Sequence, residues 1–372
     1  MTAFELFFDL VFVFSLTQVT RLVIEHPDLQ GVLRGMLVLA LLWWAWGAYA
    51  WLTNAVDTDS PSSRLVILTS MGCMLVVAVA VPQASGRDAL AFALGYLVVR
   101  VLHVLLFAVA GGANRAAILK LAPGNLAASI LLIIGVFTSD NIQVLLWTLA
   151  VLIDYGTPLI TGVGGFNVHA AHFFERHQLF IIIALGESIV AIGVGVLHAE
   201  EALTPVVVGA VFLAVLAIGG LWWAYFDWEA ALTERVLRNA LGSHRAHLAR
   251  DMFSYLHLLL VVGIVFVAVG LEGVMAHPTQ QLHGVQQLGL GAGPALFLLG
   301  LSAVSGRRGH RPRIDHLAGA VACLALIPIA AVMPALVTLA LLVCILLVIA
   351  VMDRSTRIRS HPSVAGLVTP HE

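Results

Sequence analysis

The chain has 372 residues, of which 60% are hydrophobic and 11% are charged, and its formal net charge is −2. Soluble domains carry about 25% charged residues, so this composition excludes a soluble globular protein and predicts a chain that lies in a lipid bilayer. Nothing in it indicates nucleic-acid binding. The three cysteines show no paired spacing and indicate neither a disulfide framework nor a metal box.

Twelve apolar segments are long enough to cross a bilayer as helices, since a span needs about 20 residues. No stretch between them is long enough for a soluble domain, so we predict an all-α polytopic membrane protein. Pro158 in the sixth segment is expected to break that helix locally. In chain order the segments lie near 4–24, 36–53, 65–83, 89–111, 121–138, 142–162, 178–197, 204–226, 254–275, 285–303, 315–332 and 335–352.

The basic residues indicate an orientation. Most of the 19 Lys and Arg residues fall in the loops on the side that both termini share. Cytoplasmic loops of membrane proteins carry an excess of Lys and Arg. We therefore expect both termini in the cytoplasm, which also requires an even number of spans.

A weak internal repeat divides the chain near its middle. "LWWAW" at 42–46 recurs as "LWWAY" at 221–225, and near this offset Asp9 aligns with Glu187. Parallel repeats of this kind build some transporters, although Trp pairs are also common at membrane interfaces by themselves. The repeat predicts a first six-helix half at 1–162, a cytoplasmic His/Glu/Arg connector at 163–177 and a second six-helix half at 178–352. A cytoplasmic tail at 353–372 is expected to be disordered.

Ionisable side chains within spans are costly to bury and are functional by default. The candidates for proton handling or acid–base chemistry are Asp9, Asp154, Glu187, Asp251, Tyr255 and His257. The candidates for substrate binding are Glu5, Asp57, Arg100, His103 and Arg176. A structural alternative stays open, in which Arg100 neutralises Asp154 or Glu187 as a buried ion pair and His257 is a neutral core histidine.

Two His-x-x-His pairs precede the seventh and ninth spans on the predicted cytoplasmic side. Imidazoles at i and i+3 can share one ion, so a divalent metal is a possible cofactor, although the sequence requires none. Histidines flanked by arginines also face lipid headgroups without binding metal. The candidate ligands are His169, His172, Glu175, His244 and His247.

Several motifs resemble the bacterial low-temperature-requirement A family: "FELFFDLVFVFSLTQVTRLV", "WWAWGAYAWLTNAVD", "YLVVRVLHVLLF", "DYGTP", "HAAHFFERHQLFIIIALGESIVAIGVG" and "RDMFSYLHLLLVVGIVFVAVGLE". The resemblance implies a multi-pass protein of the bacterial plasma (inner) membrane. The family is named for a growth defect in the cold and has no settled biochemical activity. A more distant likeness links "FFDLVFVF" to the first helix of a lysosomal-type potassium channel family. The matched family positions are Glu5, Phe8, Asp9, Gln18, Asp57, Arg100, His103, Asp154, His172, Glu175, Arg176, Glu187, Asp251, Tyr255 and His257.

The leading hypothesis is a proton-coupled transporter of a small solute, in which Asp9 and Glu187 take up and release protons. It expects Asp9, Arg100, Asp154 and Glu187 to face one cavity. The alternatives are a membrane-embedded enzyme acting on a lipid or isoprenoid-like substrate, with or without metal, an ion channel, and a cold-linked sensor. A channel predicts a continuous polar pore, whereas a transporter predicts a cavity closed on one side.

Overall fold

The computed structural model describes residues 2–198, 203–309 and 313–360, and every regular element within these ranges is a helix. Eleven helical segments of the described chain are long and apolar enough to cross a membrane, and a twelfth, Ile314–Ala330, is apolar but shorter. The predicted all-α polytopic fold of about twelve spans is therefore confirmed.

Six helices form the first half of the molecule. Three of them begin at side-chain caps: Thr2 forms a capping box with Glu5, and Asp28 and Ser60 accept backbone N–H bonds at the starts of α2 and α3. Such caps satisfy backbone donors that the first helical turn leaves free. The bounds are α1 (Ala3–Glu25), α2 (Leu29–Thr53), α3 (Pro61–Ala80), α4 (Ala89–Ala110), α5 (Arg115–Val136) and α6 (Asp140–Thr161).

The second half contains longer, bent helices. One π-helical turn, Tyr225–Glu229, joins α8 to α9, and a second, Ala249–Leu256, joins α10 to α11, so each pair crosses the molecule as one continuous helix. The bounds are α7 (Ala170–His198), α8 (Pro205–Ala224), α9 (Ala230–Asn239), α10 (Gly242–Leu248), α11 (His257–Ala276), α12 (Gly284–Arg307), α13 (Ile314–Ala330) and α14 (Ala335–Ser360).

Three boundaries differ from the sequence-based expectation. Helix α7 begins at Ala170, so the last part of the expected connector is already helical. Helix α14 continues to Ser360, whereas a disordered tail was expected from residue 353; residues 361–372 lie outside the described residues. Pro158 does not break α6, which continues to Thr161. Pro158 lies in the last turn of α6, so its ring and missing N–H leave most of the backbone hydrogen bonds of that helix intact.

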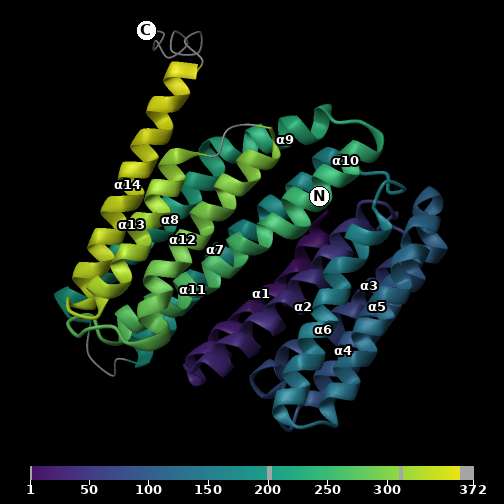
Figure 1. Ribbon diagram of the computed structural model, residues 1–372, viewed down its shortest axis with the longest axis horizontal. Coiled ribbons are helices and arrows are strands. Elements are labelled where there is room, and N and C mark those ends of the chain that lie inside the picture. The colour runs from purple at the N-terminus through teal and green to yellow at the C-terminus, as the bar shows by residue number, and fades with distance from the viewer. Residues whose placement is uncertain (1, 199–202, 310–312, 361–372) are drawn as a thin grey trace.

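The two halves pack their helices in the same way. In the first half α1 contacts α2 and α3, α3 contacts α4, α4 contacts α5, α5 contacts α6, and α2 contacts α4 and α6. In the second half α7, α8, α11, α12, α13 and α14 correspond in that order to α1–α6. Each contacting pair of the first half has a contacting counterpart among them. Figure 1 shows the two groups side by side, with α1 at the boundary between them. The two groups of six helices thus share one pattern of contacts, and their origin as an internal repeat stays a prediction.

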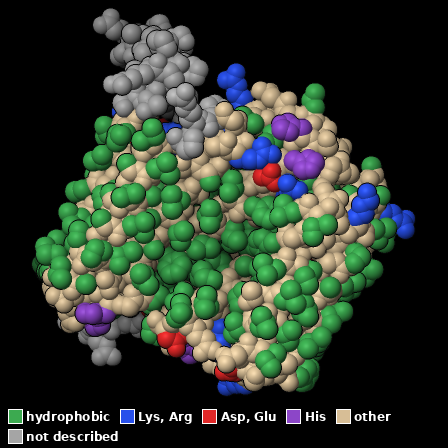
Figure 2. All heavy atoms as spheres, viewed as in Figure 1, with side chains coloured by type: hydrophobic (Ala, Val, Ile, Leu, Met, Phe, Trp, Pro, Cys, Tyr) green, Lys and Arg blue, Asp and Glu red, His purple; other side chains and the backbone are tan. Residues whose placement is uncertain are grey.

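The polar side chains of the viewed face gather at its two ends. Figure 2 shows hydrophobic side chains over the middle and most charged and His side chains toward either end, as a bilayer requires. The start of α1 and the end of α14 lie at the same end of the bundle, together with α9 and α10. We call this the basic end because Arg64, Arg115, Arg250 and Arg313 lie in the loops and helix ends on that side.

Candidate functional site

Helices α1 and α7 run side by side in the same direction and form a polar boundary between the halves. From the basic end inward, Glu5 contacts His172 at 2.9 Å, Asp9 contacts Arg176 at 2.5 Å, and Thr17 donates to Glu187 at 3.1 Å. Residue numbers rise together on both helices, as a parallel pair requires. We call these three contacts the α1/α7 seam.

The middle contact of the seam is a fully buried ion pair. Arg176 donates to Asp9 and, at 2.5 Å, to the Thr53 hydroxyl, while the Trp46 indole N–H donates to Asp9 at 2.8 Å. The guanidinium lies 5.9 Å from the ring centre of Phe8. A buried charge is tolerated when it is paired and hydrogen-bonded in this way. Arg176, expected at a cytoplasmic surface, instead links the two halves because α7 begins before it.

The outermost contact of the seam occupies both ring nitrogens of His172. Nε2 contacts Glu5, and Nδ1 lies 3.2 Å from the side-chain amide of Asn54. Asn54 also exchanges two hydrogen bonds with the backbone of His169. A histidine that binds a metal needs a free ring nitrogen, and His172 offers none here.

The five candidate metal ligands do not come together. The His169, Glu175 and His244 side chains are exposed, and His247 uses Nδ1 to contact the backbone carbonyl of Ser243 at 2.7 Å. Across the described residues, the one group of three side chains with ligand atoms within 4.8 Å of one another contains none of them. The His-x-x-His pairs thus form no shared site in this structure.

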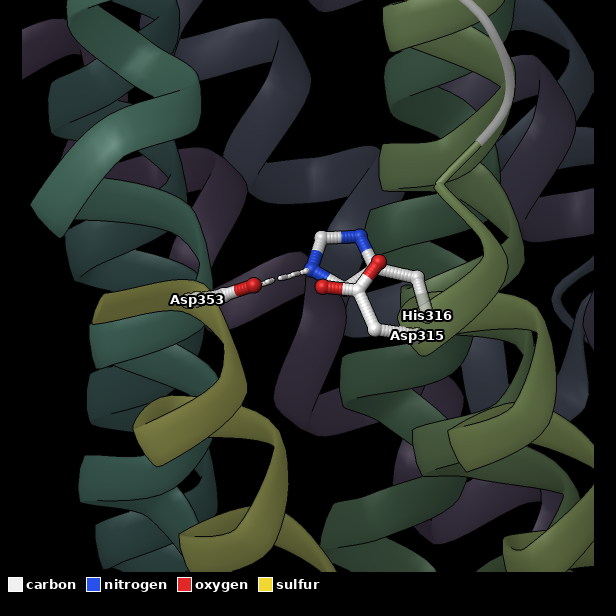
Figure 3. A group of neighbouring side chains, drawn as sticks. All are labelled: Asp315, His316 and Asp353. Atoms are coloured by element: carbon white, nitrogen blue, oxygen red, sulfur yellow. Dashed lines mark hydrogen bonds and ion pairs between the residues drawn. The ribbon is translucent and has the colours of Figure 1, made fainter. Parts of the chain in front are cut away.

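That one group consists of Asp315 and His316 on α13 and Asp353 on α14, with His316 and Asp353 facing each other (Figure 3). Arg313 donates to both carboxylates and, at 3.1 Å, to Glu229. Burial lowers the pKa of Arg313, but these carboxylates outweigh that effect and hold its pKa above the ordinary value. Arg313 therefore already supplies the positive charge that a metal would bring. Sequence reasoning missed this group because acidic residues at span ends look like ordinary interfacial residues.

Glu187 lies on the wall of a cavity of about 360 Å³ between α1, α7 and α11. It is buried, its hydrogen-bond partner is the Thr17 hydroxyl, and no Arg or Lys of the described chain forms an ion pair with it. A second carboxylate, Glu272 of α11, lines the same cavity. Sequence reasoning did not single out Glu272, since a glutamate near the end of an apolar run resembles an interfacial residue.

This cavity reaches the surface at the end opposite the basic end. Its rim includes Arg21 and Glu25, whose side chains are 63% and 38% exposed and pair with each other at 2.6 Å. Toward the basic end it stops at Thr17 and Glu187. The two remaining contacts of the seam lie beyond that point. The cavity is thus open at one end and closed at the other.

A second buried ion pair lies inside the first half. Arg100 of α4 donates to Asp154 of α6 at 3.2 Å and to Asn125 of α5 at 2.5 Å. The Tyr96 hydroxyl donates to the other Asp154 oxygen at 3.0 Å. Of the two carboxylates expected to neutralise Arg100, the structure selects Asp154. Arg100 and His103 both border a separate cavity of about 60 Å³.

The expected single site is therefore wrong. Glu187 lines one cavity, Arg100 lines another, and Asp9 lines neither because Arg176 and Trp46 enclose it. Sequence depth alone suggested one cluster, but the structure places Asp9 and Glu187 at the α1/α7 seam and Arg100 with Asp154 inside the first six helices.

The candidates that precede and begin α11 have structural partners. Asp251 pairs with Arg250 at 2.7 Å and with Arg307 at 2.8 Å. The Tyr255 hydroxyl donates to the backbone carbonyl of Tyr155. Neither Asp251 nor Tyr255 lines one of the two cavities.

His257 and Asp57 lie away from both cavities as well. His257 is buried, with Nδ1 2.7 Å from the carbonyl of Met252 and Nε2 2.9 Å from the Tyr225 hydroxyl. Asp57 is exposed in the turn after α2, where it accepts the backbone N–H of Asp59. These contacts match the structural alternative for His257.

Comparisons with known proteins cover nearly the whole chain. A family model described as bacterial low temperature requirement A protein matches residues 1–351, which include both six-helix halves. An uncharacterized protein of Rhizobium meliloti (strain 1021) is 32% identical over 314 residues, which are 80% of this chain and 75% of that protein.

Proposed function

We propose a transport function for this chain, which belongs to the bacterial low temperature requirement A family. In this proposal it moves a small solute across the bacterial plasma membrane in a proton-coupled manner, with the basic end in the cytoplasm. The observation that carries the proposal is Glu187, a buried carboxylate on the wall of a cavity between the two groups of six helices, with which no Arg or Lys of the described residues forms an ion pair.

Glu187 suits proton coupling because of its surroundings. An isolated carboxylate is costly to bury as an anion, so it takes up a proton when its cavity is closed to water and releases it when water enters. Thr17 supplies a hydroxyl that can serve either protonation state, since a hydroxyl both donates and accepts. Asp9 lacks this freedom in the described conformation, because Arg176 compensates its charge.

The seam supports alternating access. Repeat transporters expose a central site to one side at a time by moving one half against the other. Here the contacts Glu5–His172 and Asp9–Arg176 close the basic end, while the Glu187 cavity is open at the other end. A cavity closed on one side favours a transporter over a channel, which needs a continuous pore. Opening toward the basic end requires these two contacts to separate.

The test uses purified protein in liposomes with an imposed pH gradient. We would measure uptake of labelled lactate, alanine, glucose and tetramethylammonium, which represent an anion, a zwitterion, a neutral solute and a cation. Protein-free liposomes give the background. We expect gradient-driven uptake of one class, and the Glu187→Gln variant should lose the gradient dependence while it still exchanges labelled for unlabelled solute.

Glu25→Gln is the matched control, because Glu25 lines the same cavity at its exposed rim and pairs with Arg21. It should retain gradient-driven uptake. Equal gradient dependence in the wild-type protein and Glu187→Gln would sink the proton-coupling proposal. The absence of uptake of all four solutes by the wild-type protein would count against transport itself.

A further inference from the structure

We propose that the cavity beside Arg100 is a binding site for a short-chain monocarboxylate anion. The cavity lies between α2, α4, α5 and α6 of the first half and the π-helical turn Ala249–Leu256 that precedes α11, and it is distinct from the Glu187 cavity. Binding there does not depend on transport, so the proposal stands apart from the function proposed above.

Arg100 carries unused hydrogen-bond donors. Its side chain is 1% exposed, and both of its bonds, to Asp154 and Asn125, come from Nη2. Nε and Nη1 are buried and have no partner within the structure. A guanidinium N–H forms a strong, charge-assisted hydrogen bond to a carboxylate oxygen. Both bidentate edges of the Arg100 guanidinium include Nη2, which Asp154 and Asn125 occupy, so a carboxylate would accept from one of the free nitrogens, Nε or Nη1. A buried donor left unbonded is costly, so an anionic ligand with an acceptor oxygen satisfies this side chain.

The charges around the cavity favour an anion. Arg100 and Arg250 line it, and Arg250 shares Asp251 with Arg307. With Asp154 as the second carboxylate, three guanidinium groups face two carboxylates, which leaves one positive charge in excess. A monoanion brings this set to neutrality, which favours an anionic ligand beside the buried Arg100 guanidinium.

The remaining walls favour a short apolar tail. Most of the lining residues are apolar, among them three tryptophans and two phenylalanines, and the polar Asn125 lies beside Arg100. A volume of about 60 Å³ holds roughly four to six water-sized groups at 10–15 Å³ each. Propionate, with a carboxylate and a two-carbon tail, matches this size. The aromatic lining consists of Trp43, Trp44, Trp51, Phe107 and Phe166.

Gly47 provides a way to close the cavity without touching Arg100. It lies in the wall on α2, is buried, and a Cβ atom built on it meets no heavy atom within 4 Å. A valine there projects into the cavity itself. Gly219 on α8 is the matched control, because its Cβ also meets nothing within 4 Å but the residue is exposed on the outer face.

The experiment measures propionate binding to the purified full-length protein in detergent by isothermal titration calorimetry, with tryptophan fluorescence as a second readout. We expect saturable binding of propionate and none of propionamide, which has the same shape without the charge. Arg100→Gln and Gly47→Val should each weaken binding by about tenfold or more. Gly219→Val should bind like the wild-type protein.

Octanoate separates a short-chain site from one for a fatty acid tail, and we expect it to bind more weakly than propionate. Binding that strengthens from propionate to octanoate refutes the short-chain site. Absence of propionate binding, or equal binding by the wild-type protein and Gly47→Val, overturns the proposal outright. Gly47→Val keeps the test valid even if Arg100→Gln fails to fold.

Discussion

Replacing Arg176 by methionine tests whether the seam holds the two halves together through a buried ion pair. Methionine has a similar reach but no charge, so the Asp9 carboxylate loses its cation while both residues stay 0% exposed at the side chain. Removing one partner of a buried pair costs about 3–5 kcal/mol, because the other charge stays in a low-dielectric interior. For 372 residues, at about 2.1 cal/mol/K of unfolding entropy per residue, this free energy corresponds to a drop of roughly 4–6 °C in the unfolding midpoint.

The assay is thermal unfolding in mild detergent, followed by tryptophan fluorescence. Arg21→Met is the matched control, since Arg21 also pairs with a carboxylate, Glu25, but its side chain is 63% exposed. An exposed pair contributes about 0–1 kcal/mol, so this midpoint should hardly move. The double variant Arg176→Met with Asp9→Asn removes the unpaired charge and keeps an acceptor for Trp46. It should recover much of the lost stability. A midpoint for Arg176→Met equal to that of Arg21→Met, or no recovery in the double variant, would show that the reasoning is wrong.

Three further outcomes are expected in the same assay. Gly270→Val should destabilise the folded protein by about 1–3 kcal/mol through overpacking, because a Cβ there lies 2.6 Å from the backbone N of Leu290. Gly219→Val is the control and should leave the midpoint unchanged, because a Cβ there has open space; equal midpoints for the two variants would refute the close α11–α12 packing. Arg313→Met should lower the midpoint, because Asp315 and Asp353 lose their arginine, whereas Glu229 keeps Arg308. Added Zn²⁺ should restore part of the loss in this variant but leave the wild-type protein unchanged; stabilisation of the wild-type protein by Zn²⁺ would reveal a metal site that Arg313 does not fill. Glu187→Gln should keep or raise the midpoint, since it removes a buried charge that no Arg or Lys of the described residues neutralises; a large loss would mean that the Glu187 charge stabilises the fold.

The number and the class of the helices were predictable from sequence, because a span must be long and apolar to satisfy its backbone in lipid. Eleven of the twelve predicted spans meet that criterion, and the exception, α13, is 17 residues long. Helix ends were less predictable. The apolar run of α7 begins near residue 178, yet the helix begins at Ala170, because its first turns pack against the other half rather than lipid.

Individual partners were predictable only in part. The position of Arg100 near the middle of its span allowed two ion-pair partners, Asp154 and Glu187, and the sequence could not choose between them. Arg176 was placed at a surface, because an arginine near a span end usually faces water or headgroups, and nothing local shows that Asp9 lies opposite it. Sequence distance hides this contact, which joins residues 167 positions apart.

The sequence by itself determined that this chain is a membrane protein of about twelve helices and that its polar groups are few, and it predicted two similar halves from a weak repeat. Hydrophobic length and repetition are local properties, so they can be read along the chain. Only the tertiary structure decided which polar groups meet. It brought α1 beside α7, enclosed Asp9 with Arg176, and left Glu187 and Arg100 in separate cavities. Those outcomes depend on the rotation of each helix against its neighbours, which many side-chain contacts set together.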